Sequence, residues 1–161
     1  MDEEALAAAR ARALSSPLRL RILRSCLHEG KTNKQLAGEF GINAGSMLHH
    51  VRALVSTGLL RAEEPRRGTR GAREVPYRAT GISWGTFVPG VSTILVQTFL
   101  QEIDGLDPES LDVTRMGLKL TPEHREEFGR ELRELIKRWH DRGPDGGGEA
   151  FSVFSVVHPE R

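Results

Sequence analysis

Cysteine is almost absent from this chain, and long apolar runs are missing altogether. Cys26 is the only cysteine among 161 residues, so an internal disulfide is impossible and the fold does not need an oxidising compartment. No apolar run approaches the roughly 20 residues that span a bilayer. The first residues, MDEEALAAARAR, are acidic and then basic, unlike a signal peptide. We therefore expect a cytoplasmic protein that has no membrane partner.

Catalytic and metal-binding motifs are also lacking. The sequence has no GxSxG motif, no phosphate-binding glycine loop and no paired carboxylates with a supporting base, so we do not expect an enzyme. The adjacent His49 and His50 point about 100° apart if they lie on a helix, so they cannot easily share one metal ion. We therefore predict no metal site and no cofactor.

Net charge is low, but its distribution along the chain is uneven. The formal charge is +1 overall, and 38% of the residues are apolar, which is enough for one ordinary core or two small ones. Residues 1–81 hold 14 Lys and Arg against 8 Asp and Glu, whereas residues 82–161 hold 9 against 14. A basic half beside an acidic half indicates a polyanionic partner for the first half and a different task for the second.

Two short helical patterns meet at a tight turn between Thr32 and Leu60. The first covers residues 33–39, with Thr32 placed as its N-cap, and the second covers about 43–57, with Asn43 as its cap. Gly41 lies in the turn between them and tolerates a positive φ. Apolar residues recur at spacings of three and four in the second helix: Met47, Leu48, Val51, Leu54 and Val55. This pattern predicts a helix-turn-helix whose second helix has a buried stripe and a polar face suited to a DNA major groove.

Two short strands are predicted after the second helix, over residues 59–65 and 74–80. The segment between them, RRGTRGAR, is an arginine loop punctuated by glycine, and no acidic residue lies between Glu64 and Glu74. Clustered cations at a hairpin tip favour phosphate or minor-groove contact, because counterion release rewards them without sequence specificity. An ordinary solvated loop is the alternative.

Residues 16–80 resemble the ArsR-type winged helix regulators of bacteria. The resemblance rests on SSPLRLRIL at the first core helix, on KQLAGEFGINAGSMLHHVRALVSTGLL, and on the arginine wing that ends in VPYRATG. The sequence departs from the family at Leu48, where a small polar residue is common. The resemblance implies a homodimer that binds an inverted repeat in double-stranded DNA. It also implies that Ser46, His49 and Arg52 face the DNA, and that His50 either contacts phosphate or packs.

The complete set of expected DNA-binding residues combines the helix-turn-helix and the wing. Its members are Thr32, Lys34, Gln35, Asn43, Ser46, His49, His50, Arg52, Arg66, Arg67, Arg70 and Arg73.

The N-terminal residues 2–14 predict an alanine-rich helix with few large apolar side chains. It either packs on its own domain or reaches across a dimer, and the sequence leaves both open. Cys26 lies beside the apolar stripe of the next helix and is expected to be a small buried hydrophobic residue.

The second half of the chain begins after a glycine- and proline-marked linker near Gly81. We expect a helix over 91–103 at the dimer interface, with packing inside one chain as the alternative. A strand over 111–120, a helix from Thr121 and a strand over 150–157 follow. The expected dimerisation residues are Leu6, Ile94, Leu95, Phe99 and Ile103. Five aromatic residues are predicted to form core more readily than a ligand pocket: Trp84, Phe87, Trp139, Phe151 and Phe154.

The predicted fold class is therefore α+β and mainly helical. A winged helix-turn-helix domain with an N-terminal arm covers 1–81, and a helix-strand-helix-strand unit for dimerisation or effector sensing covers 82–161. The leading hypothesis is a dimeric DNA-binding transcription regulator, with an unidentified small-molecule effector as an additional candidate partner. The alternatives are a winged-helix module that binds proteins and a metal-responsive repressor.

Overall fold

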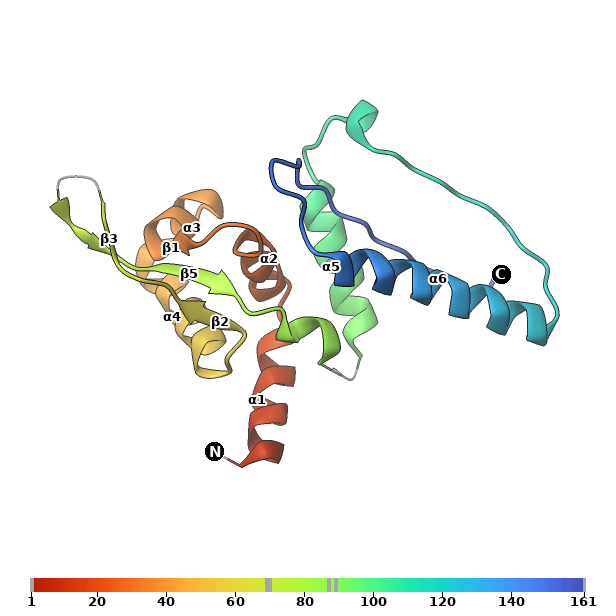
Figure 1. The fold of residues 1–161 in the computed structure, drawn as a ribbon, viewed down its shortest axis with the longest axis horizontal. Helices are drawn as coiled ribbons and strands as arrows, with labels where there is room; N and C mark the ends of the chain where they lie inside the picture. The colour runs from red at the N-terminus through yellow and green to blue at the C-terminus, as the bar shows by residue number, and fades with distance from the viewer. Residues whose placement is uncertain (1, 69–70, 87, 89, 161) are drawn as a thin grey trace. The chain divides into compact units, whose positions relative to one another are not determined.

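The computed structural model describes residues 2–68, 71–86, 88 and 90–160 (Figure 1). Its contacts divide the chain into two compact units, Met1–Gly105 and Leu106–Arg161. The mainly helical α+β class is confirmed. The sequence predicts a functional division at Gly81, whereas the structural division falls later because the helix after the wing packs on the first unit.

The first unit contains all of the strands in the described part of the chain. In chain order its elements are α1 (Glu3–Leu14), α2 (Pro17–Ser25), β1 (Lys31–Thr32), α3 (Asn33–Glu39), α4 (Ala44–Ser56), β2 (Leu60–Ala62), β3 (Arg66–Arg67), β4 (Arg73–Glu74), β5 (Pro76–Ala79), the 3-10 helix η2 (Ile82–Gly85) and α5 (Val91–Ile103). The second unit contains the 3-10 helix η3 (Pro108–Ser110) and the long helix α6 (Pro122–Arg142). None of the described helices combines the length and apolar character that a membrane span requires.

Helices α3 and α4 begin at side-chain caps, at the two residues that the sequence predicts. The Thr32 hydroxyl accepts a hydrogen bond from the Gln35 backbone N–H at 3.2 Å, and the Gln35 side chain accepts from the Thr32 backbone N–H at 2.9 Å, which together form a capping box. Asn43 caps α4 by accepting from the Ser46 backbone N–H at 2.9 Å. These caps satisfy N–H groups that lack partners inside each helix, so both helices begin where the chain needs them.

A small antiparallel sheet closes the first unit. Its strand order is β1-β5-β2, and Leu60 pairs with Ala79 while Thr32 pairs with Pro76. The chain then extends beyond this sheet as the short ladder β3-β4, which carries the predicted wing. The hairpin expected over 59–80 is therefore present, in two segments.

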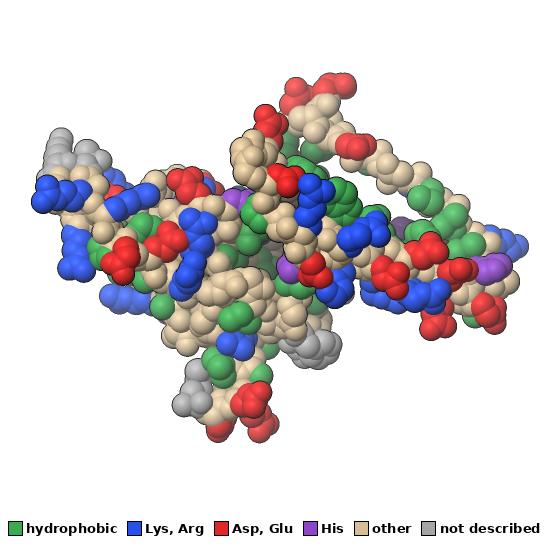
Figure 2. Space-filling model, in the orientation of Figure 1, with side chains coloured by type: hydrophobic (Ala, Val, Ile, Leu, Met, Phe, Trp, Pro, Cys, Tyr) green, Lys and Arg blue, Asp and Glu red, His purple; other side chains and the backbone are tan. Residues whose placement is uncertain are grey.

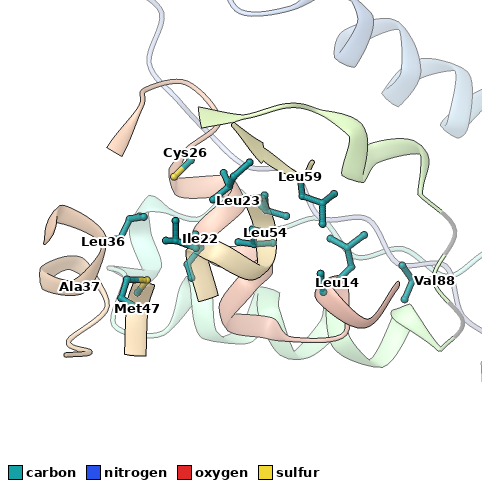
Figure 3. Close-up of a cluster of buried hydrophobic side chains, with 13 residues drawn as sticks. Leu14, Ile22, Leu23, Cys26, Leu36, Ala37, Met47, Leu54, Leu59 and Val88 are labelled. Carbon is teal, nitrogen blue, oxygen red and sulfur yellow. The ribbon is translucent and has the colours of Figure 1, made fainter. Parts of the chain in front are cut away.

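The core lies where α1 to α4 meet the sheet (Figure 3). Its largest fully buried side chains are Ile22, Leu36, Met47, Leu54, Leu59, Leu60, Val51 and Cys26. Burial raises the pKa of the Cys26 thiol to about 11, so this thiol stays protonated at neutral pH, as expected for a small buried hydrophobic residue. Val55, by contrast, is exposed and does not join the buried stripe of α4.

Helix α5 packs on α2 through one of its faces. The side chain of Thr98 is buried, and an ion pair joins Arg24 Nε to Glu102 Oε1 at 3.0 Å. Val96 and Leu100 lie on the opposite side of the helix and are exposed, and Leu95, beside Thr98 around the helix, is exposed as well. Packing within the chain thus accounts for only one face of the apolar stripe.

The two strands predicted in the second unit do not form. Residues 111–120 and 150–157 have no strand or bridge, and Val113 and Phe151 are 79% and 86% exposed. A strand needs a neighbour that pairs its N–H and C=O groups, and these segments have no such neighbour in the described part of the chain. The prediction that the aromatic residues form core is also wrong for Trp84, Trp139 and Phe151, which are exposed. Phe87 lies outside the described residues, and Phe154 is half-buried.

Candidate nucleic-acid interface

The turn between α3 and α4 sets the direction of the second helix. Gly41 adopts φ 63°, and the Ile42 backbone N–H donates to the Ala37 carbonyl at 3.0 Å. The Asn33 side chain adds a link across the turn, because its Nδ2 donates to the Ala44 carbonyl at 2.9 Å. The start of α3 is thereby fastened to the start of α4, and the two helices are held at a defined angle.

One face of α4 is open to solvent along its whole length. Gly45, His49, Arg52 and Ser56 are spaced by three and four residues, and all are exposed. Ser46 is exposed beside them, while the opposite face is buried. The exposed face offers hydroxyl, imidazole and guanidinium groups, which are the types that read base edges in a major groove.

His50 lies at the border between the buried and the exposed faces of α4. Its side chain is half-buried, and its Nδ1 is buried without a hydrogen-bond partner among the described residues. Burial lowers the pKa of His50, and the nearby Arg19 and His49 lower it further. Since the ring is neutral at neutral pH, it lacks the charge that would attract a phosphate. Of the two roles that the resemblance implies, packing is the one that this environment favours.

The lowered pKa of His50 makes stability depend on pH. The unfolded chain binds this proton more readily than the folded one, so the contribution is fully present above the ordinary pKa of 6.5 and is lost as the pH falls below it. We expect a His50→Gln variant to have a flatter melting temperature profile between about pH 7 and pH 5 than the parent protein. Thermal denaturation over this range measures the effect. His49→Gln is the control, and equal profiles for both variants would contradict the assignment.

Thr32 does not belong to the exposed surface. It is 3% exposed, and its hydroxyl is used in the capping box with Gln35. A buried hydroxyl cannot reach a phosphate, so the prediction that Thr32 contacts DNA conflicts with its position. Lys34, Gln35 and Asn43 are exposed around the same two helix starts.

A Thr32→Ala variant separates capping from DNA contact. We expect it to lower the free energy of unfolding by about 1 kcal/mol, because the Gln35 backbone N–H loses its acceptor. The salt dependence of DNA binding should stay unchanged. Urea denaturation measures the first effect and fluorescence anisotropy the second. A shallower salt slope with unchanged stability would return Thr32 to the contact set.

The wing carries uncompensated arginines. Arg67 on β3 pairs directly with Arg73 on β4, although like charges in facing positions repel. Both side chains are exposed, as is that of Arg66, and none of the three forms an ion pair with a described residue. Figure 2 shows Lys and Arg side chains gathered at the wing end of the first unit. The fourth candidate, Arg70, lies outside the described residues.

A side-chain hydrogen bond connects the wing to the helix-turn-helix. Arg66 Nη2 donates to Gln35 Oε1 at 3.2 Å, and the same oxygen accepts from the Thr32 backbone N–H. The wing base and the N-terminus of α3 therefore share an acceptor. No sequence pattern indicates this link, because its partners are separated by 31 residues.

A second positioning contact joins α1 to α4, and no sequence pattern indicates it. Arg10 of α1 donates from Nε to the Thr57 carbonyl at 3.0 Å, at the C-terminal end of α4. Thr57 is the C-cap of that helix, where a cation is favourable because the carbonyl groups carry partial negative charge. α1 thus stabilises the end of the helix that carries the candidate contacts.

The candidate dimerisation residues are distributed over two helices. Leu6 is half-buried on α1, which buries only Ala13 and Leu14. On α5, Leu95 is exposed, whereas Ile94, Phe99 and Ile103 are half-buried.

The described residues contain no group of three potential metal ligands.

Helices α3 and α4, the three-stranded sheet and the arginine wing together define a winged helix-turn-helix. No protein-family model matches the chain, and no curated protein matches it either.

Solved structures with a similar fold are ArsR-family and related winged helix-turn-helix transcriptional regulators. An ArsR-like transcriptional regulator from Rhodococcus sp. RHA1 is 22% identical, with a TM-score of 0.43, over 63% of this chain and 87% of that one. NolR from Sinorhizobium fredii is 24% identical, with a TM-score of 0.39, over 65% and 95% of the two chains. A homodimeric winged helix-turn-helix DNA-binding domain from Mycobacterium bovis, from a possible ArsR-family regulator, is 22% identical, with a TM-score of 0.42, over 64% and 88%. The likeness concerns the fold.

Proposed function

We propose that this protein is a dimeric, sequence-specific DNA-binding transcription regulator without catalytic activity of its own. The observation that carries the proposal is that two polar surfaces, the exposed face of α4 and the wing, lie in the same unit. The exposed face of α4 holds His49 and Arg52, the wing holds uncompensated arginines, and the Arg66–Gln35 hydrogen bond connects the wing to the helix-turn-helix.

In this proposal α4 enters the major groove. Ser46, His49 and Arg52 supply donors and acceptors to base edges, while Lys34 and Asn43 lie at the helix starts near the phosphates. The wing contacts the backbone or the minor groove through its arginines. Backbone contacts supply affinity and register, and the α4 contacts supply the choice of sequence.

Two copies are proposed to pair through Leu6 of α1 and the apolar residues of α5. Two winged helix-turn-helix units related by a two-fold axis match an inverted repeat in DNA. The match requires the two α4 helices to lie about 34 Å apart, which is one turn of duplex. A ligand can bind more tightly to a dimer with one α4–α4 distance than to a dimer with another. Such a ligand changes the affinity for DNA, and the coupling free energy is the same for ligand and DNA. This gives a small-molecule effector a route to control binding.

The test is a titration of the full chain against duplex DNA from its own promoter region and against random duplex of equal length. Two salt concentrations are used, and the mass in solution is recorded for the same samples. We expect a dimer that prefers the promoter duplex, with affinity that falls as salt rises. Equal affinity for both duplexes would remove sequence specificity from the proposal. Failure to bind any duplex would favour the protein-binding alternative.

A further inference from the structure

Helix α6 carries an apolar seam with the spacing of a coiled coil. Phe128, Leu132, Leu135 and Trp139 are separated by four, three and four residues. This is the alternation of the two inward positions of a heptad, which keeps a narrow seam on one side of the helix. The 21 residues of α6 make it the longest helix in the described part of the chain.

The seam is not covered within the second unit. No described residue of that unit is buried, and Leu135 and Trp139 are 43% and 58% exposed. Phe128 and Leu132 are only half-buried. Most of the stability of a protein helix comes from packing of its apolar face, so this seam needs a partner.

Charge along α6 changes sign from one end to the other. The first turns carry Glu123, Glu126 and Glu127 against one arginine, and the last turns carry Lys137, Arg138 and Arg142 against one aspartate. Two parallel copies would place like charges side by side at both ends. Two antiparallel copies place the acidic end of each beside the basic end of the other.

The residues that border the seam agree with this orientation. Glu131 precedes Leu132 and Arg138 precedes Trp139, so both occupy the same flanking heptad position. Both are exposed, and neither forms an ion pair with a described residue. In an antiparallel pair centred between Leu132 and Leu135, Glu131 of one copy lies opposite Arg138 of the other.

We propose that α6 binds the α6 of a second copy of this chain in an antiparallel coiled coil. The Phe128-to-Trp139 seam is the contact, and two Glu131–Arg138 pairs set the orientation. This interface goes beyond the proposed function, whose dimer contacts lie on α1 and α5. It is tested without DNA, so its failure and the failure of DNA binding are separate results.

The decisive experiment uses cysteine pairs in the full chain. Cys26 is buried with a raised pKa, so introduced thiols are the reactive ones at neutral pH. A Glu131→Cys/Arg138→Cys variant treated with a short thiol cross-linker is expected to give a covalent dimer, whereas each single variant is not. The matched control is Arg130→Cys/Glu134→Cys, whose positions lie away from the seam. Cross-linking of the single variants, or equal cross-linking of the control, would overturn the antiparallel pair.

Charge reversal gives a second test that leaves the apolar seam intact. We expect Glu131→Arg or Arg138→Glu alone to raise the self-association Kd about fivefold, and the double reversal to restore it. Sedimentation equilibrium measures this Kd, with Arg130→Glu/Glu134→Arg as control. In a Trp84→Phe background, Trp139 is the only indole, and its emission should shift to shorter wavelength as protein concentration rises. A monomer with concentration-independent emission would mean that the seam is covered within one chain, and the proposal would fail.

Discussion

An Arg67→Gln/Arg73→Gln variant is expected to bind duplex DNA with a weaker dependence on salt. The slope of log affinity against log salt should become shallower by about 1.8, because each lost phosphate contact releases about 0.9 fewer counterions. Both side chains are exposed and face each other on the wing without an acidic partner, so the folded protein should tolerate their replacement. Removal of two facing cations should also leave stability unchanged or slightly raise it. Anisotropy titrations at four or more salt concentrations give the slope.

The control for the wing variant removes the same charge elsewhere. Arg125→Gln/Arg130→Gln takes two exposed arginines from α6 in the second unit. We expect its salt slope to equal that of the parent protein. If both variants flatten the slope equally, the effect comes from net charge and the wing is not a contact surface.

An Arg52→Ala variant is expected to lose discrimination between specific and random duplex. Arg52 lies on the exposed face of α4, where a bidentate guanidinium contact to guanine would contribute about 1–3 kcal/mol of discrimination. The ratio of the two affinities should fall by about fivefold to about 150-fold. Affinity for random duplex should change much less, because phosphate contacts dominate that binding. Competition titrations with both duplexes measure the ratio.

Arg12→Ala on α1 is the matched control for the Arg52 variant. It is exposed and removes the same charge from the same unit. An equal loss of discrimination in both variants would exclude a base contact from Arg52. A loss of affinity for both duplexes in equal proportion would make Arg52 a phosphate contact.

The helix-turn-helix could be predicted because its signals are local. Thr32, Gly41 and Asn43 each act within three residues of their position, as caps or as a positive φ, and the structure confirms these roles. The arginine-rich hairpin could be predicted for the same reason, since its arginines are clustered in the chain. The hydrogen bonds that connect these parts could not be predicted, because the partners of Arg10 and Arg66 are distant in sequence.

The burial of individual side chains also could not be predicted from the sequence. Thr32 has the chemistry of a phosphate contact, and only its position shows that the hydroxyl is enclosed. The strands predicted at 111–120 and 150–157 failed for a related reason. Alternating apolar residues give a segment the propensity to become a strand, but a ladder also requires a neighbour.

The hydrogen bond from Arg10 to the Thr57 carbonyl has a consequence for how α1 responds to DNA. It couples the order of the N-terminal helix to the order of the last turn of α4. Coupling between two sites is reciprocal, so a partner that holds α4 in place also makes opening of α1 more costly. Backbone amides of α1 should then exchange with deuterium more slowly in the DNA complex, although this helix lies at the far end of α4 from its Asn43 cap. Any contact that α1 makes with a second copy would be strengthened by the same free energy.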